Sequence, residues 1–253
     1  MRNPARAPRQ RRTRRRLPLL LLAPLCFALA CSSSGGSSAA DENETATAGR
    51  GRLLILAPMN FDSVLSENLT DGIPKVNSAL VVALRRHGYT VKTVRLKNFR
   101  RLFSDAAGDS FDLGDEQYAE AMRKILARLA PGDPDALIAL PSIELRNAPT
   151  VGGGARFDGV ARTLHKRGLP RDYDASTGAG GSLTGVSAHV RIWDASGRKL
   201  QDGYGGIELL TVLDFDVPNM RVQWTNERDD LFENPRFIRE GVRKALDPFV
   251  PEG

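Results

Sequence analysis

The order of apolar segments between residues 52 and 145 constrains the fold more than any other feature of the sequence. Leu53 to Ala57 is a continuous apolar run ended by Pro58, which is typical of a strand buried on both faces. The pattern that begins there predicts strands near 52–57, 89–96 and 135–141, with helices near 74–87 and 115–130 between them. Strands joined through helices in this way are connected by right-handed crossovers, so we expect these three strands to be parallel.

The second half of the sequence has a different pattern. Val186 to Trp193 alternates between apolar and polar residues, as in a half-buried strand, and Asp194-Ala195-Ser196-Gly197 has the composition of a hairpin turn. The two strands of this hairpin are expected near 185–193 and 199–212, with Gly203, Gly205 and Gly206 permitting a bulge or kink. Asn234 is expected to cap a last helix near 235–247. The sequence therefore predicts a single α/β domain whose mixed β-sheet has a parallel part plus an antiparallel hairpin, with about three packed helices.

Two segments do not fit this regular plan. Residues 97–114 hold Phe99, Phe103 and Phe111, and we predict an irregular segment pinned to the core. Residues 147–182 hold 8 of the 24 glycines and form a long insertion that is either mobile or functional. Within this insertion the spacing of Phe157, Val160, Ala161 and Leu164 favours a short helix.

The N-terminus has the three-part plan of a secretory signal peptide. Its first 16 residues are rich in arginine, and a 14-residue apolar run from Leu17 to Ala30 follows. This run is shorter than the roughly 20 residues that a membrane-spanning helix needs. The arginine pairs leave twin-arginine export open, although its usual flanking pattern is missing. We therefore expect residues 1–30 to be removed on export.

The apolar run ends in Ala28-Leu29-Ala30-Cys31, which resembles the lipobox of bacterial lipoproteins. The resemblance implies that Cys31 becomes the lipidated first residue. The lipobox leucine stands one place late, and Ala28-Leu29-Ala30 also fits ordinary signal peptidase, which would cut the same bond. Residues 31–51 are a tether rich in Ser, Gly and Ala with a span of roughly 25 Å, and residues 52–253 are the expected globular periplasmic domain.

Cysteine usage and charge agree with this division. Of the two cysteines, Cys26 leaves with the leader, so Cys31 can form neither a disulfide within one mature chain nor a cysteine metal cluster. The leader also holds eight arginines and no acid, which leaves 28 basic and 30 acidic side chains after residue 30. The formal charge of +6 therefore belongs to the leader, and we expect no nucleic-acid partner.

The tether, the strand that ends in Pro58 and the late segment Arg191-Ile192-Trp193-Asp194-Ala195-Ser196-Gly197-Arg198 occur together in one chain. This combination resembles the periplasmic lipoproteins related to the curli-secretion lipoprotein, the penicillin-binding-protein activators and the amino-terminal domain of the Tol-system propeller protein. The resemblance covers residues 31–57, 74–96 and 183–212. It implies either a subunit of an outer-membrane secretion channel or a scaffold or activator that contacts a partner enzyme.

Several fragments resemble catalytic motifs without completing one. Ser196 to Lys199 has the spacing S-x-x-K but lies in an expected turn, and Ser187 and His189 half-match a nucleophile elbow. We expect Ser187 and His189 to face solvent on a strand. Asp214 and Asp216 share a face if they lie in a strand, and paired carboxylates of that kind can bind metal or do acid–base work. Since no convergent set emerges, we predict no metal and no cofactor.

The glycine-rich insertion is the most promising place for a partner to bind. It carries six basic candidates among its glycines: Arg156, Arg162, His165, Lys166, Arg167 and Arg171. A basic mobile loop near a membrane or cell wall is suited to binding an anionic polymer, lipid headgroups or an acidic protein surface. An ordinary solvated loop is the other interpretation.

The functional expectation is a non-enzymatic envelope lipoprotein that acts as a tethered scaffold or activator. Its partners would be the membrane, through the N-terminal lipid, and another envelope protein or cell-wall polymer. Ser32 rather than Asp follows Cys31, which resembles the sorting pattern for the periplasmic side of the outer membrane. The alternatives are the secretion-channel subunit and a cell-wall or lipid hydrolase that uses Asp214, Asp216 and His189.

Overall fold

The computed structural model describes residues 51–108, 113–169, 182–216, 218–226, 228 and 230–250. The core sheet has the strand order β2, β1, β3, β7, β8. These strands are β1 (Leu53–Leu56), β2 (Thr90–Thr93), β3 (Leu137–Val151), β7 (Ser182–Asp194) and β8 (Lys199–Leu209). Strand β1 is parallel to β2 and β3, whereas β7 is antiparallel to β3 and β8. The predicted α/β class, with a parallel part beside an antiparallel hairpin, is confirmed.

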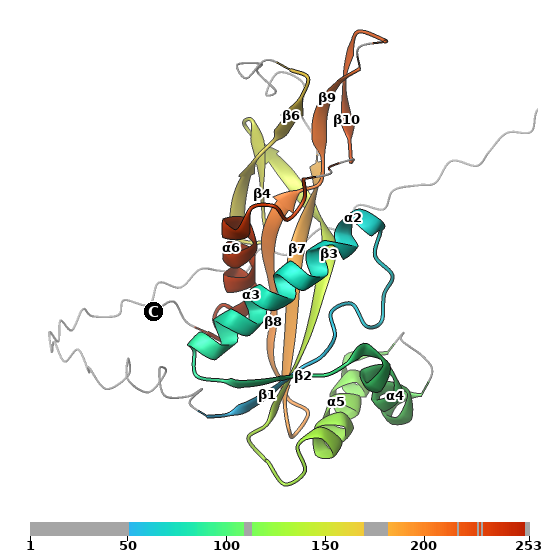
Figure 1. Ribbon diagram of the computed structural model, residues 1–253, viewed down its shortest axis with the longest axis vertical. Coiled ribbons are helices and arrows are strands. Elements are labelled where there is room, and N and C mark those ends of the chain that lie inside the picture. The colour runs from blue at the N-terminus through green and yellow to red at the C-terminus, as the bar shows by residue number, and fades with distance from the viewer. Residues whose placement is uncertain are drawn as a thin grey trace, which may run out of the picture. The chain divides into compact units, whose positions relative to one another are not determined.

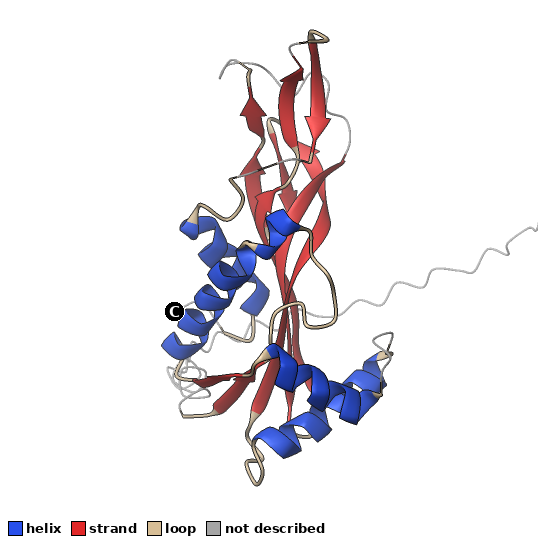
Figure 2. Cartoon of the chain, turned by 45° about the vertical axis from the view of Figure 1, so that its right-hand side comes forward, coloured by secondary structure: helices blue, strands red, loops and turns tan. Residues whose placement is uncertain are grey.

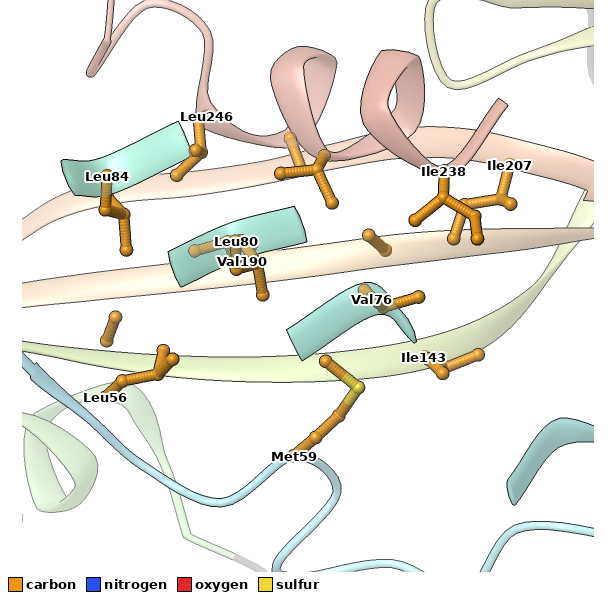
Figure 3. Close-up of a cluster of buried hydrophobic side chains, with 14 of the residues drawn as sticks. Leu56, Met59, Val76, Leu80, Leu84, Ile143, Val190, Ile207, Ile238 and Leu246 are labelled. Carbon is orange, nitrogen blue, oxygen red and sulfur yellow. The ribbon is translucent and has the colours of Figure 1, made fainter. Parts of the chain in front are cut away.

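One face of this sheet is covered by α3 (Gly72–Arg86) and α6 (Pro235–Leu246). Val76, Leu80 and Leu84 repeat every four residues along α3, so one stripe of the helix points at the sheet. Figure 3 shows this stripe and Ile238 of α6 above alternate residues of the strands. Asn234 caps α6 as predicted, since its side chain accepts a hydrogen bond from the backbone N–H of Arg236 at 3.0 Å.

The opposite face is covered, at the β1 end, by α4 (Leu96–Ala107) and α5 (Asp115–Leu129). The strand residues that point this way, Ile55, Ile138 and Trp193, alternate with those that contact α3 and α6. Figure 2 shows two separate groups of helices beside the strands. The prediction of an irregular segment over 97–114 was therefore wrong for residues 97–107, where Phe99 and Phe103 lie one turn apart and are fully buried.

The glycine-rich insertion also differs from its prediction. Its described part forms β4 (Gly154–Phe157), β5 (Val160–Thr163) and β6 (His165–Arg167), so the short helix predicted around Phe157 to Leu164 was wrong. Asp158 and Gly159 join β4 to β5 and have φ of 43° and 78°. A two-residue hairpin of the type that Asp-Gly favours needs positive φ at both positions, so the turn overrides the helical spacing.

A second hairpin, of β9 (Val212–Asp216) and β10 (Arg221–Thr225), follows β8 where we expected only a polar stretch. It pairs with β6 in a three-stranded sheet of order β10, β9, β6. We call β4, β5, β6, β9 and β10 the insertion strands. Figure 1 shows β6, β9 and β10 beyond the end of β3 and β7 that lies away from β1 and β2, whereas β4 lies alongside these strands and the β4–β5 turn at Asp158 contacts Ser187 of β7. A small apolar cluster joins β4, β5 and β9 to β7 and β8, and it includes Phe157, Leu183, Leu209 and Leu213.

Helix α6 lies unusually close to β8 because glycines line the contact. A Cβ atom at Gly205 would overlap the backbone carbonyl of Gly241 in α6. The register between β7 and β8 shifts twice. One shift is at Ile207, in the glycine-rich part of β8, and the other is at Leu200, at the start of the strand. The expected bulge is therefore present, and close helix packing gives these glycines a further role.

Candidate functional site

A row of polar side chains crosses the middle of the sheet face that α4 and α5 leave uncovered. We call it the polar belt: Ser142, Glu144 and Arg146 of β3, Ser187, His189 and Arg191 of β7, and Asp202 and Tyr204 of β8. The strand register brings it together, since Ser142 pairs with His189, which pairs with Tyr204. Directly paired residues point to the same face of a sheet. The belt therefore separates the apolar cluster under α4 and α5 from the cluster under the insertion strands.

His189 is the centre of the belt. Its Nδ1 lies 2.8 Å from Oε1 of Glu144, and its Nε2 lies 2.7 Å from Oδ1 of Asp202. The imidazole ring also stacks on the ring of Tyr204, with 3.9 Å between the two centroids. The guanidinium of Arg146 lies over the Tyr204 ring, 4.1 Å from its centroid. A carboxylate can only accept hydrogen bonds, so the doubly protonated imidazolium satisfies both contacts.

The two carboxylates around His189 are held in their charged forms. The hydrogen bond from His189 lowers the pKa of Glu144 below its ordinary value, against the opposing effect of burial. Burial raises the pKa of Asp202, but hydrogen bonds from Lys199 and His189 outweigh it, so the net shift is also downward. Lys199 in turn contacts Asp115 at the start of α5 at 3.3 Å. The belt is therefore an ionic network that joins three strands and one helix.

Ser187 does not form a nucleophile–base pair with His189. Its Oγ donates a hydrogen bond to Oδ2 of Asp158 at 2.6 Å, and Arg146 contacts the same carboxylate oxygen at 3.3 Å. Ser187 is 0% exposed and His189 is 6% exposed, so the prediction that both side chains face solvent was wrong. The cause is the turn at Asp158, which lies over Ser187, together with the ring of Tyr204 beside His189.

The other chemical candidates are placed apart from this cluster. Asp214 and Asp216 lie on β9, where Asp214 is 3.9 Å from Arg167 and Asp216 accepts from Asn219. Ser196 lies in a turn as predicted and donates to Asp194, whose carboxylate also accepts from two backbone N–H groups. Within the described ranges, no group of three or more His, Cys, Asp and Glu side chains could hold a metal ion.

The structure divides five of the six basic candidates of the insertion among three strands. Arg156 is exposed on β4, and His165, Lys166 and Arg167 are half-buried on β6. Arg162 of β5 is only 7% exposed and is bound inside the fold. Arg171, like Cys31, lies outside the described residues. The segment around these candidates is thus mostly strand where the structure describes it, rather than one basic loop.

Arg162 belongs to a buried junction between the insertion strands and α6. Its guanidinium donates to the backbone carbonyl of Gly206, lies 3.0 Å from Oε2 of Glu240 and stacks over Phe237 at 4.3 Å. Nearby, Glu208 of β8 is 3% exposed and lies 3.0 Å from Arg228. Burial raises the pKa of Glu208, although Arg228 opposes that shift. Glu208 is not among the candidates predicted from the sequence. An acid inside the apolar run from Ile207 to Leu210 is the signal that could have identified it as a buried charge.

Strand β10 presents apolar side chains to solvent. Val222 and Trp224 have exposed fractions of 38% and 41%, and their spacing of two puts them on the same face. Met220, in the turn before β10, is 74% exposed. In the three-stranded sheet of the described residues, β10 is an edge strand. Exposed apolar edge strands are where other chains pair, and proteins usually protect them.

No helix in the described part of the chain is both long and apolar enough to cross a membrane. No family model matches the chain, and a search of curated proteins finds no match either.

Proposed function

We propose that this chain is a non-enzymatic envelope lipoprotein, anchored through Cys31, that acts as a scaffold or activator by binding another envelope protein through its insertion strands. The resemblance described from the sequence supports the anchor and the class of function. Mass spectrometry of the mature N-terminus tests the anchor. We expect a diacylglyceryl-modified Cys31 as the first residue, and an unmodified Cys31 would contradict it.

The observation that carries the proposal is the exposed edge of β10. Its outer backbone groups have no strand partner among the described residues, and Val222 and Trp224 stand beside that edge. A partner that adds an extended segment here would gain backbone hydrogen bonds and bury both side chains. The insertion strands also carry the basic side chains Arg156 on β4 and His165 and Lys166 on β6, across β9 from β10, and these would favour a partner whose surface is acidic.

The polar belt supports a non-enzymatic function over the hydrolase. Both ring nitrogens of His189 already contact carboxylates, and the hydroxyl of Ser187 is committed to Asp158. A general base needs a free nitrogen within reach of the proton that it removes. The described geometry gives His189 a role in holding strands together.

Crosslinking in the native envelope, followed by identification of the captured proteins, tests the proposed binding surface. Val222→Asp should abolish capture of a partner that the unchanged protein captures, because it places a charge in the apolar contact. Gln223→Asp is the matched control, since Gln223 is exposed on the other face of the same strand. Capture that survives Val222→Asp would overturn the proposal. Stable rings that conduct ions in planar bilayers would instead favour the secretion channel.

A further inference from the structure

A groove with a volume of about 1370 Å³ lies between α3 and α6. Its floor is formed by buried apolar side chains, which include Ile238, Val242 and Leu246 of α6. Its wall on α3 contains Ala79, Ala83 and Val82, the last of which is 52% exposed. The groove is therefore an apolar surface that the fold leaves open.

The groove follows from the sequence of the two helices. On α3, Val76, Leu80 and Leu84 fill one stripe against the sheet, and Ala79, Val82 and Ala83 form a second stripe beside it. An apolar stripe this wide exceeds what one contact with a sheet requires, because a surface helix usually buries one face and presents polar residues elsewhere. Ala79 and Ala83 are partly buried against the core, whereas Val82 is 52% exposed and is available to another element.

The rim of the groove is mainly cationic. Five basic side chains line it: Lys75 and Arg86 from α3, and Arg236, Arg239 and Arg243 from α6. Two acids also line it, Glu233 and Glu240, and Glu240 is already paired with Arg162 at 3.0 Å. Three of these cations are exposed and make no ion pair with any carboxylate of the described residues: Arg86, Arg236 and Arg239. The groove therefore favours an occupant with negative charge and an apolar face.

We propose that this groove binds an acidic amphipathic helix of a partner protein. The 15 residues of α3 give a wall of about 22 Å, at roughly 1.5 Å per residue, which matches a helix of about four turns. Apolar residues at i, i+3, i+4 and i+7 of the partner would cover Val82 and its neighbours, with Asp or Glu on both flanks. The cations stand along both walls, which suits distributed acidic side chains, whereas the headgroup of one anionic lipid would need them at one end.

This inference does not depend on the function proposed for β10, because the groove is formed by other elements. Photo-crosslinking in cells that make the full chain tests it. A crosslinking amino acid at position 82 should yield a protein adduct whose captured segment is an acidic amphipathic helix. The same amino acid in place of Arg85, which is exposed on α3 but does not line the groove, should not yield that adduct.

Charge reversal provides the second arm of the experiment. The double variant Arg86→Glu and Arg239→Glu should lower the adduct yield from position 82 about tenfold, as expected when two attractive exposed charge contacts become repulsive. Arg85→Glu should leave the yield unchanged. Because the altered side chains are exposed, the circular dichroism melting curves of these variants should match that of the unchanged protein.

Several results would overturn the proposal. Absence of an adduct, an equal adduct from positions 82 and 85, or a yield that ignores charge reversal would each show that the groove does not select such a helix. An adduct with phospholipid would make the occupant a lipid. An adduct with residues 41–44, which include Asp41, Glu42 and Glu44, would make it the chain's own tether. The tether deserves this control because Gly51 is hydrogen-bonded to Gly88, close to groove residues Arg86 and His87.

Discussion

The two faces of the β3–β7–β8 sheet are built from alternate residues of the same strands, yet they differ in chemistry. The face under α3 and α6 is apolar from Leu137 through Val190 to Ile207. The other face is apolar at each end but carries Glu144, His189 and their neighbours in between. A slip of one residue would exchange these faces and press the belt against α3 and α6. Hydrophobic burial on the apolar face therefore stabilises the sheet, whereas the polar belt makes a sheet with a shifted register unfavourable.

The largest expected effect is on the apolar face. Leu80→Ala should lower the free energy of unfolding by about 2–5 kcal/mol, because Leu80 is 0% exposed and its removal leaves a cavity between α3 and the sheet. Val82→Ala, on the exposed side of the same helix, should change it by less than about 0.5 kcal/mol. Urea denaturation of both variants measures the difference. Equal losses would mean that α3 is not packed as described.

The close contact of α6 with the same face gives the next effect. Gly205→Ala should cost about 3 kcal/mol, because its Cβ would overlap the backbone of Gly241 and push α6 away from β8. Gly153→Ala serves as the control, since no atom lies within 4 Å of the added Cβ and the backbone there needs no positive φ. Thermal unfolding followed by circular dichroism compares the two. A Gly205→Ala protein as stable as Gly153→Ala would refute the close approach.

On the belt face the expected effect is smaller. His189→Ala should cost about 2 kcal/mol, because it leaves Glu144 and Asp202 without their shared donor in a half-buried setting. Water reaches both carboxylates in part, which limits the loss. His165→Ala should cost almost nothing, since His165 is 40% exposed and lies 3.9 Å from Asp230. A neutral His189→Ala variant would remove the structural role assigned to the belt.

The pattern of apolar residues was sufficient to predict the core sheet and three of its helices, because each element buries a stripe or face of its own. It was wrong at residues 97–107, although Leu96, Phe99 and Phe103 recur there at helical spacing. It also failed at Asp158-Gly159, where a turn signal competed with helical spacing. The contact of His189 with Glu144 joins residues 45 positions apart, so spacing along the chain does not reveal it. The groove likewise depends on how α3 and α6 pack together.

The smallest expected effect is the pH dependence of the belt. A carboxyl group with a lowered pKa in the folded protein stabilises the fold above its unfolded pKa, near 4.5 for Glu144 and 3.8 for Asp202. That contribution is lost as the pH falls through the lower folded values. Stability should therefore decline as the pH falls below about 5, and Glu144→Gln should make that decline shallower.

Urea denaturation across that pH range measures the slope. The matched control is Glu116→Gln, because Glu116 is an exposed acid on α5 outside the polar belt. The slope of this variant should follow that of the unchanged protein. A decline that is identical in all three proteins would show that Glu144 is not held in its charged form by His189.

The most direct test of the account compares the two regions in function rather than stability. Partner capture in the native envelope should be measured for the unchanged protein, His189→Ala and Val222→Asp, with folding checked by circular dichroism. Folded His189→Ala should capture the same envelope protein at an unchanged level, whereas Val222→Asp should lose it. If His189→Ala remained folded but lost partner capture while Val222→Asp kept it, the polar belt would be the functional site. That result would contradict the proposal that β10 binds the partner.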